Sequence, residues 1–271
     1  MSDGSVGGYA VRIGDLLMIF DTHAHYDDAA FDADRDEVIR SLPAHGVRAF
    51  VNVSAEWDSL EKTEKIAGQY DFCHAAYGIH PDNVGDLTEE RMEILRQYCL
   101  SSRCVAVGEI GLDYHFGKEH RDEQIRWFER QLGLARELSL PVIIHSRDAA
   151  EDTMEILRKE ITGIPGGVVH CYSYSKEMAL EYVSMGLMIG VGGVVTFKNA
   201  RRLKETVQAV PLESIVLETD CPYMAPEPHR GTRNTSANLV YVAQAIAGLR
   251  GITQEEVEDA TWANAEKLYH L

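Results

Sequence analysis

The sequence predicts an α/β fold, a (β/α)8 TIM barrel in a single domain. Short apolar runs alternate with segments of helical periodicity from residue 18 onward. Eight such runs separated by helices imply a parallel sheet. The chain has 271 residues, which suits a closed barrel of about 250 residues. The first run is not followed by the glycine-rich phosphate loop of open nucleotide-binding sheets, so the closed barrel is favoured.

The strand predictions rest on short apolar runs, many of them rich in valine or isoleucine. Pro141 begins the fifth run, a position where a missing backbone N–H is tolerated. The expected strands lie at 18–24, 48–54, 73–79, 104–110, 141–146, 167–172, 187–193 and 215–219.

The segments between these runs have the periodicity of amphipathic helices. Two further helices are expected to close the chain, and Thr253 with Glu256 predicts a capping box at the start of the last one. The expected helices lie at 32–45, 57–70, 88–101, 120–139, 149–160, 175–185, 199–209, 236–249 and 253–268.

Residues 1–17 are expected to lie outside the barrel as an N-terminal extension. They contain four glycines and little periodicity. The sequence leaves open whether they form a short ordered extension, a disordered tail or an artefact of the start site. Residues 18–271 contain no repeat, low-complexity tract or linker, so they are expected to form one domain, the barrel.

Composition limits the classes of partner. Hydrophobic residues make up 45% of the chain, enough for a sizeable core. No apolar run approaches the roughly 20 residues that cross a bilayer, and no basic-then-apolar signal begins the chain, so no membrane partner is expected. Five cysteines without framework spacing favour a reducing compartment, and the protein is predicted to be cytoplasmic. The net charge of −17 argues against a broad nucleic-acid-binding surface, although bound metals can reverse the field locally.

Residues of the types that bind metals fall at the C-terminal ends of the predicted strands, where catalytic groups of such barrels lie. The spacing of His23 and His25 places both side chains on one face of a strand, with Asp21 on the same face and able to orient a ligand. The candidate ligands are His23 and His25 after the first strand, Glu109 after the fourth, His145 after the fifth, His170 after the sixth and Asp220 after the eighth.

Each candidate also has a simpler explanation when taken alone. Histidines at strand ends are often hydrogen-bonded core residues, Glu109 could form a buried salt bridge to an arginine, and Asp220 could cap a loop. Together, four histidines, one glutamate and one aspartate suit two metals that share a bridging carboxylate. Asp220 could also act as the general base. Cys171 and Cys221 are expected to point away from the ligands and to pack.

Several segments occur in a fixed order along the chain. They are IFDTHAHYD (19–27), GIHP (78–81), GEIGLDY (108–114), PVIIHSRDA (141–149), HCYS (170–173), GVVTFKNA (193–200), ETDCPY (218–223), PHRG (228–231) and RN (233–234). With these segments, residues 18–271 resemble the TatD family of metal-dependent deoxyribonucleases, within the wider amidohydrolase-like barrels.

The resemblance implies two divalent metal ions, with Mg²⁺ expected in use and Zn²⁺ or Mn²⁺ as alternatives. It implies a 3′→5′ exonuclease that acts on the end of single-stranded DNA, with Asp220 and Glu109 catalytic. The implied ligands are His23, His25 and Asp220 for one metal and His145 and His170 for the other, with Glu109 as the bridge. The implied substrate contacts are His80, Arg230, Arg147 and His229.

Two other functions stay open. The same metals could hydrolyse an amide, lactone or ester, including the ester of a D-aminoacyl-tRNA. The barrel could also be a metal-binding scaffold without catalysis, although a lost ligand would then be expected and all six are present. Arg230 and Arg233 favour an anionic substrate, but surface salt bridges would also explain arginines on an acidic protein. The sequence does not predict an oligomeric state.

The chain departs from the family's usual residues at three positions. An aliphatic residue often stands in place of Tyr26, a histidine in place of Asp82 and a glycine in place of Tyr174. None of these departures removes a ligand, so they bear on substrate preference. Tyr174 could stack on a base, a contact worth about 1–3 kcal/mol, or could pack within the fold.

Overall fold

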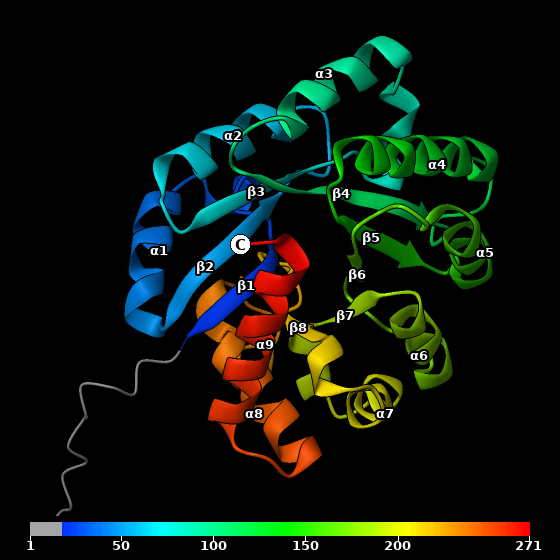
Figure 1. The fold of residues 1–271 in the computed structure, drawn as a ribbon. Helices are drawn as coiled ribbons and strands as arrows, with labels where there is room; N and C mark the ends of the chain where they lie inside the picture. The colour runs from blue at the N-terminus through cyan, green and yellow to red at the C-terminus, as the bar shows by residue number, and fades with distance from the viewer. Residues whose placement is uncertain (1–17) are drawn as a thin grey trace, which may run out of the picture.

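The eight predicted strands form one parallel barrel (Figure 1). The structure, a computed structural model, describes residues 18–271. The predicted extension 1–17 lies outside the described residues. Each strand pairs with the next in chain order from β1 to β8. Ala24 at the end of β1 bridges to Cys221 just after β8, and this contact closes the sheet into the predicted (β/α)8 barrel.

The strands are close to the predicted ranges, with differences at their C-terminal ends. They are β1 (Ile19–Ala24), β2 (Val47–Val53), β3 (Cys73–Tyr77), β4 (Cys104–Asp113), β5 (Val142–Arg147), β6 (Gly167–Val169), β7 (Leu187–Val191) and β8 (Ile215–Leu217). β4 continues beyond its predicted end. β6 and β8 stop early, and soon after each the chain turns at a residue with positive φ, Cys171 at 45° and Asp220 at 56°.

The helices surround the strands (Figure 1). They are α1 (Arg35–Ser41), α2 (Ser59–Gln69), α3 (Glu89–Cys99), α4 (Arg121–Leu138), α5 (Ala150–Glu160), α6 (Lys176–Ser184), α7 (Arg201–Ala209), α8 (Leu239–Arg250) and α9 (Gln254–Tyr269). α1 is shorter than predicted because residues 42–45 form a 3-10 turn with a proline near its start. The predicted capping box of Thr253 and Glu256 is confirmed at the start of α9. No helix within residues 18–271 combines the length and apolar character that a membrane span requires.

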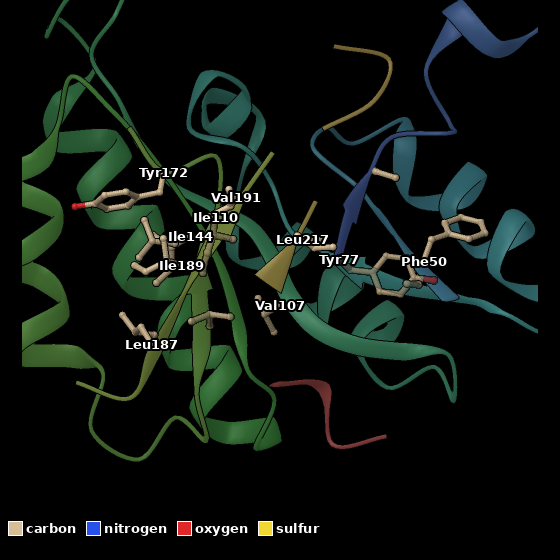
Figure 2. Close-up of a cluster of buried hydrophobic side chains, with 14 of the residues drawn as sticks. Phe50, Tyr77, Val107, Ile110, Ile144, Tyr172, Leu187, Ile189, Val191 and Leu217 are labelled. Carbon is tan, nitrogen blue, oxygen red and sulfur yellow. The ribbon is translucent and has the colours of Figure 1, made fainter. Parts of the chain in front are cut away.

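Two apolar layers stabilise the barrel. One lies inside it, because it gathers a side chain from every strand: Phe20, Val51, Ala76, Ala106, Ile143, Val168, Met188 and Val216. The other lies between strands and helices, where Figure 2 shows Phe50, Tyr77, Ile144 and Leu187 among its members. α9 joins the inner layer through Trp262 and Tyr269, whose rings lie 5.5 and 6.0 Å from that of Phe20. The N-terminal end of the barrel is therefore packed, and the opposite end is left for a site.

An irregularity in β1 changes the direction of its last side chains. Asp21 pairs with Phe50 and Ala24 pairs with Asn52. Between these two pairs β1 advances by three residues and β2 by two, so β1 contains one extra residue. Such a bulge breaks the alternation of side chains, and bulges are common at barrel rims beside active sites. His23 lies within this bulge, so the sequence alternation from Asp21 to His23 does not hold.

A second irregularity lies in β4. The segment from Val107 to Ile110 pairs with only Val142 to Ile144 of β5. Gly108 lies inside it, and a Cβ atom there would approach the Cβ of Ile143 to 2.5 Å. Only glycine leaves room for this close approach of two strands. The next residue is Glu109, so both bulges lie beside predicted metal ligands.

Candidate metal centre

Glu109 lies at the centre of the six predicted ligands, with only 3% of its surface exposed. Its Oε1 atom lies 2.6 Å from His145 Nδ1 and 2.8 Å from His170 Nε2. Its Oε2 atom lies 3.5 Å from His23 Nε2 and 3.8 Å from His25 Nε2. The two oxygens of one carboxylate therefore face two different pairs of histidines. The alternative of a buried salt bridge to an arginine does not hold for Glu109.

Asp220 joins the first pair of histidines. Its Oδ1 atom lies 3.3 Å from His25 Nε2 and 3.8 Å from His23 Nε2. The chain turns into the left-handed region at Asp220, and its backbone N–H donates to the carbonyl of His23 at 2.9 Å. Aspartate tolerates this backbone region better than most residues. The turn brings the end of β8 to the end of β1.

The hydrogen bond of His25 to the backbone directs its other ring nitrogen into the cluster. His25 Nδ1 donates to the carbonyl oxygen of Val53 at 2.8 Å, which leaves a lone pair on Nε2 in the neutral ring. That Nε2 lies 3.0 Å from His23 Nε2 and faces the carboxylates of Asp220 and Glu109. Imidazole nitrogens and carboxylate oxygens that converge in this way form the donor set of a divalent metal when the imidazoles are neutral. The residues present therefore fit the implied metals.

The carboxylates of the cluster raise the pKa of some of its histidines. Burial lowers the pKa of His25, but the carboxylates of Asp220 and Glu109 outweigh burial and raise it to about 9. Burial likewise opposes the pKa shift of His170, which Glu109 raises well above its usual range. Burial and the neighbouring His145 lower the pKa of His80 to about 3, so this ring is neutral. The cluster favours positive charge between its ligands.

Two further carboxylates support the ligand histidines, and neither was assigned from the sequence. Asp113 Oδ2 lies 2.9 Å from His145 Nε2. Glu218 Oε1 lies 3.6 Å from His170 Nδ1, and this Nδ1 and Glu218 Oε2 are both buried without a hydrogen-bond partner. The two side chains therefore face each other just beyond hydrogen-bond distance. Gly190 leaves the space, because a Cβ atom there would lie 2.3 Å from Glu218 Oε2.

We expect Asp113→Asn and Glu218→Gln each to weaken metal binding by roughly 10–100-fold, the usual cost of losing a carboxylate that orients a ligand histidine. Isothermal titration of the metal-free protein with Zn²⁺ or Mn²⁺ measures this directly. Asp152→Asn is the matched control, because Asp152 pairs with Arg121 and Tyr114 instead. Unchanged affinity in both site variants would show that these carboxylates do not orient the ligands.

The predicted substrate contacts divide into two groups. His80 and Arg147 line the same cavity as the cluster, and His80 Nε2 lies 3.8 Å from Glu109 Oε1. Arg230 instead lies 4.4 Å from the ring centre of Phe197, and His229 Nε2 contacts the hydroxyl of Tyr241 at 3.2 Å. Neither Arg230 nor His229 belongs to the lining of the two cavities beside the cluster.

The predicted role of Asp21 needs correction. Its carboxylate accepts from the backbone N–H of His23 and Thr219 and from the hydroxyls of Thr219 and Ser236, and from neither imidazole nitrogen of His23. The Asp21 carboxylate therefore links β1 to the segment after β8. It holds the backbone of His23 and Thr219 and forms no hydrogen bond with the ring of His23. The physical reason is the bulge in β1, which turns His23 away from the face of Asp21.

Several other sequence expectations meet a definite outcome. Arg233 forms a two-pronged salt bridge with Asp34 at 2.7 and 2.6 Å, as the surface alternative predicted. The hydroxyl of Tyr174 contacts Ser146 at 3.0 Å, which supports packing rather than base stacking. Cys221 is buried as predicted, but Cys171 lines a cavity beside the cluster, because β6 ends before it and alternation no longer applies.

A (β/α)8 barrel with clustered histidines and carboxylates at the C-terminal ends of its strands defines the class of metal-dependent barrel hydrolases. Residues 20–270 match the family model for TatD related DNase. The chain therefore belongs to the TatD family of metal-dependent hydrolases.

Individual relatives match over nearly their whole length. The chain is 41% identical over 254 residues to the metal-dependent hydrolase YabD of Bacillus subtilis, covering 94% of this chain and all of that protein. It is 30% identical over 258 residues to the 3′-5′ ssDNA/RNA exonuclease TatD of Klebsiella pneumoniae, covering 93% and 98%. The crystal structure of the TatD homologue YJJV from Escherichia coli superposes with a TM-score of 0.89 at 30% identity, covering 94% and 99%.

Proposed function

We propose that this protein hydrolyses phosphodiester bonds with two divalent metals, as a 3′→5′ exonuclease on single-stranded DNA. The arrangement of Glu109 carries the proposal, because its two oxygens face separate pairs of histidines, as a carboxylate bridging two metals would. The exonuclease named among the relatives supports this choice of substrate.

The roles of the residues follow from their positions. His23, His25 and Asp220 would hold one ion and His145 and His170 the other, with Glu109 between them. The bound ions, Mg²⁺ first and Mn²⁺ or Zn²⁺ as alternatives, would lower the pKa of a water and offset the charge that develops on phosphate.

The remaining groups would handle the proton and the phosphate. Asp220 would accept the proton of the attacking water. His80 Nδ1 accepts the backbone N–H of Asp82 at 3.2 Å, so the proton of this neutral ring lies on Nε2. That N–H and the guanidinium of Arg147 can donate to a phosphate oxygen in the cavity they share.

The test is cleavage of single-stranded DNA labelled at its 3′ or 5′ end, with EDTA, Mg²⁺, Mn²⁺ or Zn²⁺. We expect the strand to be shortened stepwise from its 3′ end, and this cleavage to stop when EDTA is added. The ion that supports the fastest cleavage identifies the metal that the enzyme uses. Absence of cleavage by folded, metal-loaded protein would overturn the proposal. A panel of amide, lactone and ester substrates, including a D-aminoacyl-tRNA, would then be assayed.

A further inference from the structure

The mouth of the barrel is divided by the metal cluster into two unlike halves. One cavity of about 640 Å³ lies over the ends of β1–β5, and another of about 250 Å³ lies over the ends of β5–β8. They share His145, Arg147, His170 and Asp220. A phosphodiester held at the cluster would therefore have one cavity on each side of its phosphorus atom.

The β1–β5 cavity is acidic. Its wall carries the carboxylates of Asp27, Asp28, Glu56 and Asp82, against the cation of Lys62. Arg147 belongs to both cavities and lies at the boundary. Carboxylates in this number repel a phosphate group that is not bound to a metal. This half therefore suits a part of the substrate that carries hydroxyls and no further phosphate.

Apart from the charged and histidine residues at the cluster, the β5–β8 cavity is lined mainly by small and apolar groups, and it adjoins a groove that contains two arginines. Val194, Leu203 and Ser173 line it, and the same three residues line an adjoining groove with Arg201 and Arg202 at the start of α7. In Figure 1, α7 lies outside β7 and β8. The groove thus continues the path that begins at the metals.

Arg201, Arg202 and Arg230 together form what we call the α7 patch. Arg201 is 86% exposed and pairs with Glu205 of its own helix. Arg202 and Arg230 form no salt bridge with any carboxylate of residues 18–271. Arg230 rests on the ring of Phe197, which lies four residues before Arg201 in the segment that leads into α7. On a chain with a net charge of −17, this patch is a local region of positive charge, and such a region attracts an anionic partner.

We infer, building on the proposed function, that the α7 patch binds the phosphates on the 5′ side of the scissile bond, while the acidic cavity takes the 3′-terminal nucleoside. With the proposed 3′→5′ direction, the nucleoside released is the 3′-terminal one, which ends in a hydroxyl and has no phosphate on its 3′ side. The base before the cleaved bond lies against Val194 and Leu203. The cationic patch on one side and the acidic cavity on the other then orient the strand with its 3′ end in the acidic cavity. Because that cavity repels a further phosphate, the strand cannot extend beyond its 3′ end.

The first test compares wild-type protein with Arg201→Ala/Arg202→Ala on a labelled 12-nucleotide strand and on a dinucleotide. We expect KM for the longer strand to rise roughly tenfold or more, with kcat and the dinucleotide unaffected. The slope of log(1/KM) against log salt becomes shallower by about 1.4, or about 0.7 for each lost phosphate contact. Arg158→Ala/Lys159→Ala, which removes two charges at the far end of α5, is the control and leaves these values unchanged.

The second test concerns the acidic cavity. Wild-type protein is expected to cut a strand with a 3′-phosphate far more slowly than the same strand with a 3′-hydroxyl. In the Glu56→Gln/Asp82→Asn variant, which lacks two of the carboxylates of this cavity, the cleavage rates of the two strands are expected to be closer to each other. Equal cleavage of both ends by the wild-type protein, or an unchanged KM and salt slope in the patch variant, would overturn the inference.

Failure of the proposed function would look different. It would appear as no cleavage of either strand by the wild-type protein. Binding of the fluorescent 12-nucleotide strand to the metal-loaded wild-type protein, measured by anisotropy, still tests the patch in that case. Loss of binding on adding Arg201→Ala/Arg202→Ala supports the patch, and unchanged binding rejects it.

Discussion

Glu109→Gln is expected to fold normally and to lose roughly 10³-fold or more of its kcat/KM. Two metals contribute several kcal/mol to stabilising the transition state, and about 1.4 kcal/mol is a factor of ten in rate. A neutral amide keeps the shape of Glu109 but removes the charge that faces both histidine pairs. We expect metal analysis of the purified variant to find less bound metal than in the wild-type protein, together with the loss of DNA cleavage.

The control for this prediction is another buried glutamate. Glu258 in α9 is also 3% exposed, and it accepts a hydrogen bond from Gln254 far from the cluster. Glu258→Gln makes the same chemical change without touching a ligand, so it should retain metal and activity. If Glu109→Gln kept full activity and the metal content of the wild-type protein, Glu109 would not be a metal ligand or a catalytic residue.

The sequence predicts the barrel well because its information is local. Apolar runs and helical periodicity depend on neighbouring residues, and the parallel topology then follows from the alternation of strand and helix. The same reasoning places His25, Glu109 and Asp220 at one end, since all C-terminal strand ends of a barrel meet there. The structure places His25 Nε2 3.8 Å from Glu109 Oε2 and 3.3 Å from Asp220 Oδ1.

The contacts that sequence reasoning missed depend on geometry across strands. Asp113 reaches His145 because β4 runs past its predicted end, and Asp21 accepts a hydrogen bond from Ser236, which lies 215 residues further along the chain. Nothing in a local pattern reports either feature. The available signal was chemical, since Asp113 and Glu218 are carboxylates next to apolar strand residues, where an unpaired charge is costly.

The positions of arginines are equally hard to derive. Arg230 and Arg233 are three residues apart in one loop, but Arg233 is held by Asp34 and Arg230 lies on Phe197. A long arginine side chain can reach partners that are distant in the sequence. Its contacts are therefore known only from the folded structure. This difference is why the α7 patch includes Arg230 and leaves Arg233 out.

Asp220→Asn is expected to lose roughly 10²–10⁴ of the rate, the usual contribution of a general base, with little change in thermal stability. Asparagine accepts the left-handed backbone of this position, where φ is 56°, and keeps the volume of the side chain. Because the amide cannot accept the proton of the attacking water, kcat should fall even when the metal is saturating. Steady-state kinetics and a melting curve for each variant measure both properties.

Asp220→Ala and Asp220→Gly separate chemistry from backbone strain. Alanine in the left-handed region costs about 1–2 kcal/mol, so Asp220→Ala should melt at a lower temperature than the asparagine variant. Glycine adopts this region freely, so Asp220→Gly should avoid that strain and still lack activity. If the glycine variant recovered activity that the alanine variant lost, the backbone turn that joins β8 to His23, and not the carboxylate, would be the contribution of Asp220.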